Sequence, residues 1–180
     1  PSADHAKQVQ EGIFPFSVSS GRRVSTTTLD SKSQILIESS VAAHNHYTVT
    51  EVNDLLKTCE ELGLEVIPLV QTFGHLEFVL KHNEFSYLRD VEEMPESICP
   101  CHNDTMGIVR EIVDQVMAAH KKAKYLHIGC DEVYHLGECS DCSGQGRTDV
   151  FVKHVSTVAN YVKNKYPQVS LNLLNLLKVR

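Results

Sequence analysis

The sequence has 180 residues, of which 42% are hydrophobic and 22% charged, and its formal net charge at pH 7 is −6. These values are typical of a globular protein with a hydrophobic core. The negative charge argues against nucleic acid or an anionic membrane as the main partner. No apolar run approaches the length of about 18 residues that a transmembrane helix needs.

The first 34 residues are the least informative part of the sequence, and the Thr26–Thr28 run with its surroundings shows no helical period. They contain neither the basic segment nor the apolar segment of a signal peptide, so we expect a cytoplasmic and/or nuclear protein. The stretch from Ser17 to Ser40 is rich in serine and threonine. We therefore expect residues 1–34 to be a divergent, flexible segment and residues 35–180 to form the folded unit. The apolar run before Glu38 predicts a short strand over Ile35–Glu38.

Helices and strands are predicted to alternate along the rest of the chain. The first helix has a capping-box pattern, because Thr48 can cap it and Glu51 lies three residues later. Proline residues predict a loop over Met94–Cys101. The first helix is expected to end before Gly63. The remaining expected elements are a strand over Leu64–Val70, a helix over Leu76–Leu88, a helix over Asn103–Lys124, a strand over Tyr125–Gly129, a helix that Thr148 caps and that stops before Pro167, and a strand over Val169–Leu174.

This alternation predicts an α/β fold with a parallel sheet. If the sheet curls, right-handed crossovers place the helices on one side of it, as in a (β/α)8 barrel. A complete barrel takes about 250 residues, so the chain is expected to form a partial one. Functional side chains of such barrels lie at the carboxyl ends of the strands, where His75, Asp131 and Glu132 are predicted to be.

The most informative stretch is the end of the Tyr125–Gly129 strand, where two adjacent carboxylates follow an apolar run. A buried strand does not tolerate unpaired carboxylates, because desolvating even an uncharged polar group costs several kcal/mol, about 2–7. We therefore expect Asp131 and Glu132 to face a cavity beyond the strand. The alternative interpretation is a solvated acidic turn, which is the common one for an isolated Asp-Glu pair.

Two motifs of this sequence resemble those of the family 20 glycoside hydrolases, the β-N-acetylhexosaminidases. The first is His-x-Gly-x-Asp-Glu followed by an apolar residue, which stands intact over His127–Val133. The second is the run Leu69–His75, in which a strand leads into Gly-His. The resemblance extends from about His44 to about Ser170. It implies a partial TIM barrel that covers about strands 2–5 with their helices.

The resemblance also implies a reaction and a role for each site residue. Terminal N-acetyl-D-hexosamine residues, GlcNAc or GalNAc, would be hydrolysed with retention by a substrate-assisted mechanism, in which the 2-acetamido oxygen acts as nucleophile. Glu132 would be the general acid and base, and Asp131 would orient the acetamido group. His75 would support Glu132 through a hydrogen bond, or be only a structural residue. His127 is expected to anchor the loop, and Tyr134 either lines the sugar pocket or packs.

The six cysteines admit other chemistry. Cys130, beside the acid pair, could be a nucleophile, but packing is the favoured interpretation. Cys139 and Cys142 have CxxC spacing and, with Cys99 and Cys101 or His102, could form a zinc site. That signal is weak, so no metal ligand or cofactor is assigned, and whether Cys139 and Cys142 bind metal stays open. Without a visible secretory signal, reduced thiols are expected.

The sequence leaves two functions of different classes open. One is the glycosidase, with an N-acetylhexosamine-containing glycan or glycoconjugate as its partner. The other is a truncated, non-catalytic sugar-binding or interaction fragment. Self-association into a homo-oligomer is a further expectation, because a partial barrel exposes sheet edges and apolar surface.

Overall fold

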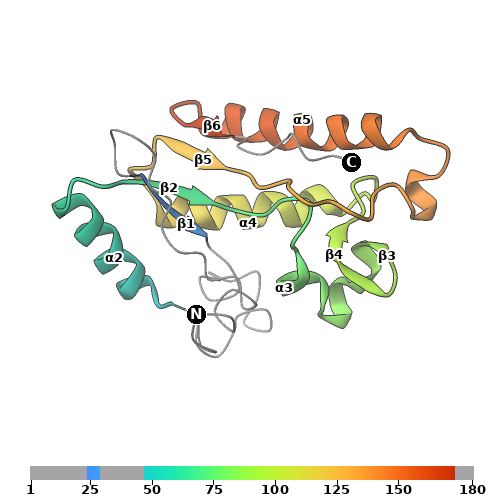
Figure 1. The fold of residues 1–180 in the computed structure, drawn as a ribbon, viewed down its shortest axis with the longest axis horizontal. Coiled ribbons are helices and arrows are strands. Elements are labelled where there is room, and N and C mark those ends of the chain that lie inside the picture. The colour runs from blue at the N-terminus through green and yellow to red at the C-terminus, as the bar shows by residue number, and fades with distance from the viewer. Residues whose placement is uncertain (1–23, 29–46, 173–180) are drawn as a thin grey trace.

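The structure is a computed structural model, which describes residues 24–28 and 47–172. The described elements alternate in the way the sequence predicts (Figure 1). Along the chain they are β1 (Val24–Thr28), α2 (Val49–Glu61), β2 (Glu65–Leu69), α3 (Glu77–Leu80), a 3-10 helix (Asn83–Leu88), β3 (Arg89–Val91), β4 (Met94–Ile98), α4 (Thr105–Ala119), β5 (Tyr125–His127), a 3-10 helix (Ser140–Cys142), α5 (Arg147–Lys165) and β6 (Ser170–Asn172).

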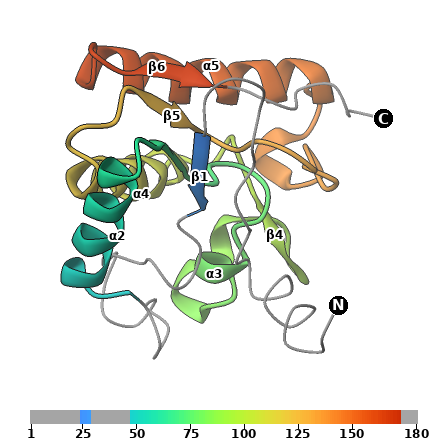
Figure 2. The same cartoon turned by 60° about the vertical axis from the view of Figure 1, so that its left-hand side comes forward.

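Four strands form a parallel sheet in the order β1-β2-β5-β6, which is also their order along the chain. When parallel neighbours follow each other in this way, right-handed crossovers place the connecting helices on the same face. Accordingly, α4 packs against both α2 and α5, and the two views show the helices side by side along the sheet (Figures 1 and 2). The predicted α/β class with a parallel sheet is confirmed. In the described part of the chain the sheet is open and does not close into a barrel.

The capping box at the start of α2 is present as predicted. The Thr48 hydroxyl accepts a hydrogen bond from the Glu51 backbone N–H at 3.2 Å, and the Glu51 carboxylate accepts one from the Thr48 N–H at 2.7 Å. Two of the unpaired N–H groups at the helix start are thereby satisfied. The helix ends before Gly63, whose φ of +67° is a left-handed conformation that glycine adopts without strain.

The segment between β2 and α4 differs from the prediction. The helix expected over Leu76–Leu88 is wrong in part, because the chain turns after α3 and resumes as a 3-10 helix. The loop expected over Met94–Cys101 is also wrong, since β4 pairs with β3 in an antiparallel hairpin. Pro95 is compatible with this strand, because a strand of a two-stranded sheet has one side on which no N–H is needed.

Before Tyr47, the structure describes only one stretch of the chain. Residues 24–28 form β1 and pair in parallel with β2, from Val24 opposite Glu65 to Thr28 opposite Leu69. The rest of the flexible segment expected over residues 1–34 lies outside the described residues, and that expectation stays a prediction. The serine- and threonine-rich composition predicts flexibility, but threonine is β-branched and is also common in strands. The strand expected over Ile35–Glu38 lies outside the described residues.

A hydrogen-bonded carboxylate connects α4 and α5. One oxygen of Asp114 on α4 accepts from the Tyr161 hydroxyl at 2.6 Å and from the Tyr166 hydroxyl at 2.7 Å. The other oxygen accepts from Lys165 Nζ at 2.5 Å. Burial works to raise the pKa of Asp114, but these hydrogen bonds outweigh it and the pKa is lowered. The ionised carboxylate is therefore the form that this contact favours.

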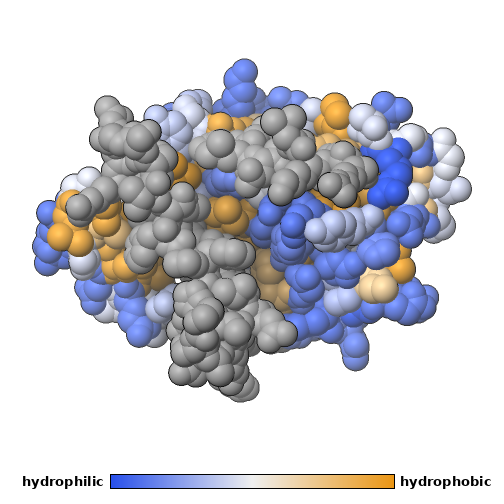
Figure 3. All heavy atoms as spheres, in the orientation of Figure 1, coloured by the Kyte–Doolittle hydropathy of each residue, from blue (hydrophilic) through white to orange (hydrophobic). Residues whose placement is uncertain are grey.

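On the face that Figure 3 shows, hydrophilic residues are prominent, and apolar residues gather near α2. Val49, Leu55 and Leu62 belong to this helix or its C-terminal end and are 61%, 38% and 64% exposed. Among the helices of the described residues, none combines the length and the apolar character needed to cross a membrane.

We expect Asp114→Asn to lower the free energy of unfolding at pH 7 by about 1–2 kcal/mol, since it weakens hydrogen bonds to a charged acceptor. The pKa of Asp114 is lowered in the folded state. The loss should therefore be fully present above the unfolded carboxyl value of about 3.9 and disappear as the pH falls through the lower folded value. Urea unfolding of both proteins across this pH range would measure it. A loss that stays constant as the pH falls would contradict the assignment.

Candidate functional site

The predicted site residues lie where β2 and β5 end. Leu69 at the end of β2 pairs with His127 at the end of β5, and the Val70 N–H donates to His127 O at 2.9 Å. Both chains then leave the sheet at its carboxyl edge. The polar residues that follow each strand are therefore brought to one place, as the parallel arrangement predicts.

Two glycines allow these segments to approach closely. A Cβ atom at Gly129 would lie 2.0 Å from Gln71 Oε1 and 3.0 Å from Gln71 Cα, and the φ of Gly129 is +69°. A Cβ atom at Gly74 would lie 2.8 Å from the carbonyl oxygen of Asp131. Residues with a side chain Cβ cannot make these contacts without displacing their neighbours. The glycine of each motif is thus needed for packing.

A buried hydroxyl joins the two segments. Thr72 is fully buried, and its hydroxyl donates to Ile128 O at 2.7 Å. The Cys130 sulfur lies 3.2 Å from the same hydroxyl oxygen. Either atom can be the donor in this second contact, and the Cys130 thiol also donates to Ile128 O at 3.5 Å. Burial raises the pKa of Cys130 to about 11, which keeps it a thiol and disfavours a nucleophilic role.

The site side chains meet just beyond this junction. His75 Nε2 lies 3.4 Å from Glu132 Oε2 and 3.9 Å from Asp131 Oδ2. The other oxygen of Asp131, Oδ1, accepts a hydrogen bond from Gln71 Nε2 at 3.1 Å. The imidazole therefore faces both carboxylates, and the amide holds one of them in a fixed orientation.

Backbone strain is concentrated at this site. Among the described residues, the non-glycine positions with positive φ are His75, Cys130 and Glu132, with values of 54°, 74° and 51°. A left-handed conformation costs a residue with a Cβ about 1–2 kcal/mol. Such costs persist where the surrounding structure imposes them, commonly at functional sites. Here the strained positions include His75 and Glu132, which face each other.

The carboxylates are accessible to a ligand. The exposed fraction is 36% for the side chain of Asp131, 53% for Glu132 and 38% for His75. The side chains are therefore neither sealed in the core nor free in solvent without neighbours. This arrangement can present a proton donor and an oriented carboxylate to a molecule that approaches from the open edge of the sheet.

The other two predicted site residues behave differently. His127 is buried, and its Nδ1 accepts a hydrogen bond from the Gly129 N–H at 3.1 Å. This contact is consistent with an anchor for the turn after β5. Tyr134 is 63% exposed, and partial burial together with the nearby Glu132 carboxylate raises the pKa of its hydroxyl. Arg147 at the start of α5 donates to Tyr134 O at 2.8 Å and holds this part of the loop.

Two supporting residues were missed by the sequence interpretation. Gln71 belongs to the second motif, and its signal was a polar residue directly after a buried strand, opposite the end of another strand. His154 had no such signal, because it occupies one position on the buried side of α5. Its Nε2 donates to Thr72 O at 2.8 Å, and its ring lies 4.2 Å from that of Phe73. Burial lowers the pKa of His154, so the ring is neutral and structural.

Potential metal ligands gather in another part of the molecule. Asp90, Cys99, Cys139 and Cys142 place their ligand atoms within 4.8 Å of one another. These residues belong to the β3–β4 hairpin and to the loop that follows the carboxylates. They are separate from the group formed by Gln71, His75, Asp131 and Glu132.

Comparison with known proteins gives a family match over most of the chain. The family model described as "Glycosyl hydrolase family 20, catalytic domain" matches residues 14–172. Hexosaminidase D of Bos taurus is 39% identical over 132 residues, which cover 69% of this chain and 38% of the bovine protein. Hexosaminidase D of Homo sapiens is 40% identical over 132 residues, which cover 69% of this chain and 27% of the human protein. The chain thus spans well under half the length of both relatives.

Solved structures with a similar fold include two hexosaminidases. A β-N-acetylhexosaminidase from Bacteroides fragilis has a TM-score of 0.57 and 22% identity, and the match covers 73% of this chain and 28% of that chain. A mutant β-hexosaminidase from Streptomyces plicatus in complex with its product GlcNAc has a TM-score of 0.56 and 20% identity. This match covers 70% of this chain and 24% of that chain. At these identities the similarity concerns the fold.

We expect Gly129→Ala to lower the free energy of unfolding by about 2 kcal/mol or more. The substitution adds the cost of a left-handed conformation, about 1–2 kcal/mol, to the collision with Gln71. Gly107→Ala is the matched control, because Gly107 lies in α4 and nothing stands within 4 Å of its added Cβ. The free energy of unfolding of that control should rise by up to about 1 kcal/mol, because alanine has a higher helix propensity than glycine. Equal effects of both substitutions in urea unfolding would contradict the close approach of the two segments.

Proposed function

The chain belongs to glycosyl hydrolase family 20, and from this premise we propose that it carries the acid pair of a β-N-acetylhexosaminidase. The proposed reaction is the hydrolysis of terminal N-acetyl-D-hexosamine residues, GlcNAc or GalNAc, from a glycan or glycoconjugate with retention of configuration. The observation that carries the proposal is the placement of Asp131 and Glu132 after β5, in contact with His75 and Gln71 from the end of β2.

Glu132 is proposed as the general acid and base. Its carboxylate is about half exposed, so it can reach both a leaving oxygen and an attacking water. His75 Nε2 at 3.4 Å can hydrogen-bond Glu132 and keep it in position between the two proton transfers. In the first step Glu132 donates a proton to the leaving oxygen. In the second step it takes a proton from water, which restores its starting state.

Asp131 is proposed to orient the 2-acetamido group of the sugar. In a substrate-assisted mechanism, the acetamido carbonyl oxygen attacks the anomeric carbon, and the amide N–H then needs a negatively charged acceptor. Gln71 fixes Asp131 by donating to Oδ1, which leaves Oδ2 directed toward the side of His75 and Glu132. A carboxylate held in place before the reaction also stabilises positive charge that develops on the sugar ring.

The remaining site residues are proposed to have supporting roles. His127 anchors the turn through the Gly129 N–H. Tyr134, which is exposed and close to the Glu132 carboxylate, is a candidate for contact with the sugar. We further propose that the open sheet corresponds to about strands 2–5 of a (β/α)8 barrel. This proposal is supported by the parallel order of β1, β2, β5 and β6 and by the similarity in fold to two hexosaminidases.

The decisive variant is Glu132→Gln, which cannot donate or accept the catalytic proton. We expect the complete protein to release the chromophore from an aryl N-acetyl-β-hexosaminide, and the variant to lose about 10²- to 10⁴-fold in kcat. Glu111→Gln, an exposed position on α4, is the control and should retain full turnover. The matching aryl β-glucoside, which lacks the acetamido group, should not be hydrolysed. Unchanged turnover of Glu132→Gln would reject the proposed role.

Gln71 offers a test of how Asp131 is positioned. We expect Gln71→Ala to lower kcat about tenfold with a smaller change in KM, because a freely rotating Asp131 meets the acetamido group less often in the reactive geometry. Thermal unfolding should be measured alongside, since a merely structural effect would lower the melting temperature and leave kcat per folded molecule unchanged. A change confined to KM would indicate instead that Gln71 contacts the substrate.

The alternative is a non-catalytic sugar-binding or interaction fragment. It is favoured by one observation, that the chain covers 38% and 27% of the two hexosaminidase D relatives. If the 180-residue chain and its Glu132→Gln variant are equally inactive but both bind a thiazoline analogue of GlcNAc, the fragment function is supported. The expected cytoplasmic and/or nuclear location and self-association stay predictions.

A further inference from the structure

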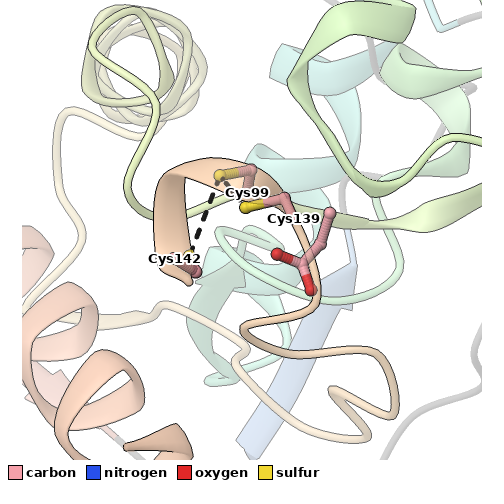
Figure 4. A group of neighbouring side chains, drawn as sticks. Cys99, Cys139 and Cys142 are labelled. Carbon is pink, nitrogen blue, oxygen red and sulfur yellow. Dashed lines mark hydrogen bonds between the residues drawn. The ribbon is translucent and has the colours of Figure 1, made fainter. Parts of the chain in front are cut away.

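Three thiols and a carboxylate from distant parts of the sequence meet beside the β3–β4 hairpin. Cys99 follows β4, whereas Cys139 precedes the short 3-10 helix Ser140–Cys142 and Cys142 is its last residue. Figure 4 shows the Cys99 and Cys139 sulfurs pointing toward each other, with Cys142 opposite Cys99. The Cys99 sulfur lies 2.8 Å from that of Cys139 and 3.9 Å from that of Cys142. All these cysteines are free thiols in this structure.

The fourth member of the group is a buried carboxylate with an unused oxygen. Asp90 on β3 is only 3% exposed. Its Oδ2 accepts a hydrogen bond from the Glu138 N–H at 3.0 Å, but its buried Oδ1 has no hydrogen-bond partner. An unpaired buried carboxylate oxygen is costly, and such groups usually have a cation or a hydrogen-bond donor beside them. A carboxylate oxygen of Asp90 and the three sulfurs all lie within 4.8 Å of one another.

We propose that Cys99, Cys139 and Cys142 bind one zinc ion through their sulfurs and that Asp90 Oδ1 completes a four-coordinate site. Zinc in proteins is held by four ligands at about 2.3 Å from sulfur and about 2.0–2.2 Å from oxygen, in tetrahedral geometry. Two sulfurs of such a site are about 3.8 Å apart. The 3.9 Å between Cys99 and Cys142 matches this spacing. Cys139 is half-buried, and its sulfur would move about 1 Å away from that of Cys99.

The chemistry of the ligands selects this class of metal. Thiolates favour zinc over the hard cations magnesium and calcium, which take oxygen ligands. On binding, each of the three thiols gives its proton to solvent and its sulfur lone pair to the metal, with no change in oxidation state. The metal would supply the positive charge that the buried Asp90 lacks.

The proposed metal site is structural and lies at the far end of the loop that carries the acid pair. This loop runs from Asp131 and Glu132 to Cys139 and Cys142. It already contacts the hairpin through His135, whose Nε2 lies 3.4 Å from Glu96 Oε1. The Glu138 N–H also donates to Asp90 Oδ2 on β3, and a zinc ion would add a stronger connection between the loop and the hairpin. We therefore expect it to restrict motion of the loop, whichever function the acid pair has.

The first experiment measures the metal directly. The purified chain should contain about one zinc per molecule by elemental analysis. After exchange with cobalt(II), it should show the thiolate charge-transfer bands and the intense d–d bands of a tetrahedral cobalt site. These measurements use the unaltered chain and so do not depend on the folding of a variant. A metal-free chain with no such cobalt spectrum would overturn the proposal.

The second experiment assigns the ligands. Cys142→Ser and Asp90→Asn should each weaken zinc binding at least tenfold, whereas the matched control Cys59→Ser should leave it unchanged. Cys59 is a buried cysteine of α2 and does not belong to the group. Cys101→Ser is a second control, because Cys101 lies near enough to Cys142 to help raise its pKa but is not among the four grouped residues. If Cys101→Ser loses zinc and Asp90→Asn keeps it, the assignment of Asp90 is overturned.

The third experiment tests the structural role and excludes a disulfide. Hydrogen exchange of residues 133–142 should increase when a chelator removes the metal, and it should not respond to the chelator in Cys142→Ser. The intact mass under non-reducing conditions should correspond to six thiols. A mass lower by two hydrogens, with Cys99 and Cys139 linked in a peptide map, would overturn the proposal in favour of a redox-sensitive disulfide.

Discussion

The candidate site depends on how closely β2 and β5 approach each other at their carboxyl ends. The last backbone hydrogen bond between the two segments runs from the Val70 N–H to His127 O. The hydrogen bond from the Thr72 hydroxyl to Ile128 O continues this contact beyond the end of the sheet. Because Thr72 is fully buried, its polar group has to be satisfied within the protein, and the carbonyl of the facing segment does so. This bond fixes the relative position of the segments that carry Gln71, His75 and Asp131.

Helix α5 stabilises this junction from outside the sheet. His154 donates to Thr72 O, and the Phe151 ring lies 5.5 Å from that of Phe73. The helix is in turn held against α4 through Asp114. A single helix therefore serves as the crossover between β5 and β6 and as the support of the loop after β2. Such double use is a consequence of the parallel order of the strands, which places all the crossover helices on one face.

The acid pair itself is less firmly held than the residues beneath it. Asp131 and Glu132 are partly exposed, and Glu132 has a left-handed backbone that costs free energy. The contacts that offset this cost lie on both sides: the buried junction at Thr72 before the pair, and the bonds of His135 and Glu138 to the hairpin after it. The geometry of the two carboxylates is thus set by the contacts on either side of them in the chain.

The sequence by itself determined the alternation of α2, β2, α4, β5, α5 and β6, because each has a clear apolar period or cap. It also placed His75, Asp131 and Glu132 at one edge of the sheet, because parallel strands bring their carboxyl ends together. Only the tertiary structure decided the β3–β4 hairpin, the role of Gln71 and His154, and the meeting of Asp90 with three cysteines. These depend on contacts between residues far apart in the chain, whose local patterns are equally compatible with a loop, a helix face or a solvated side chain.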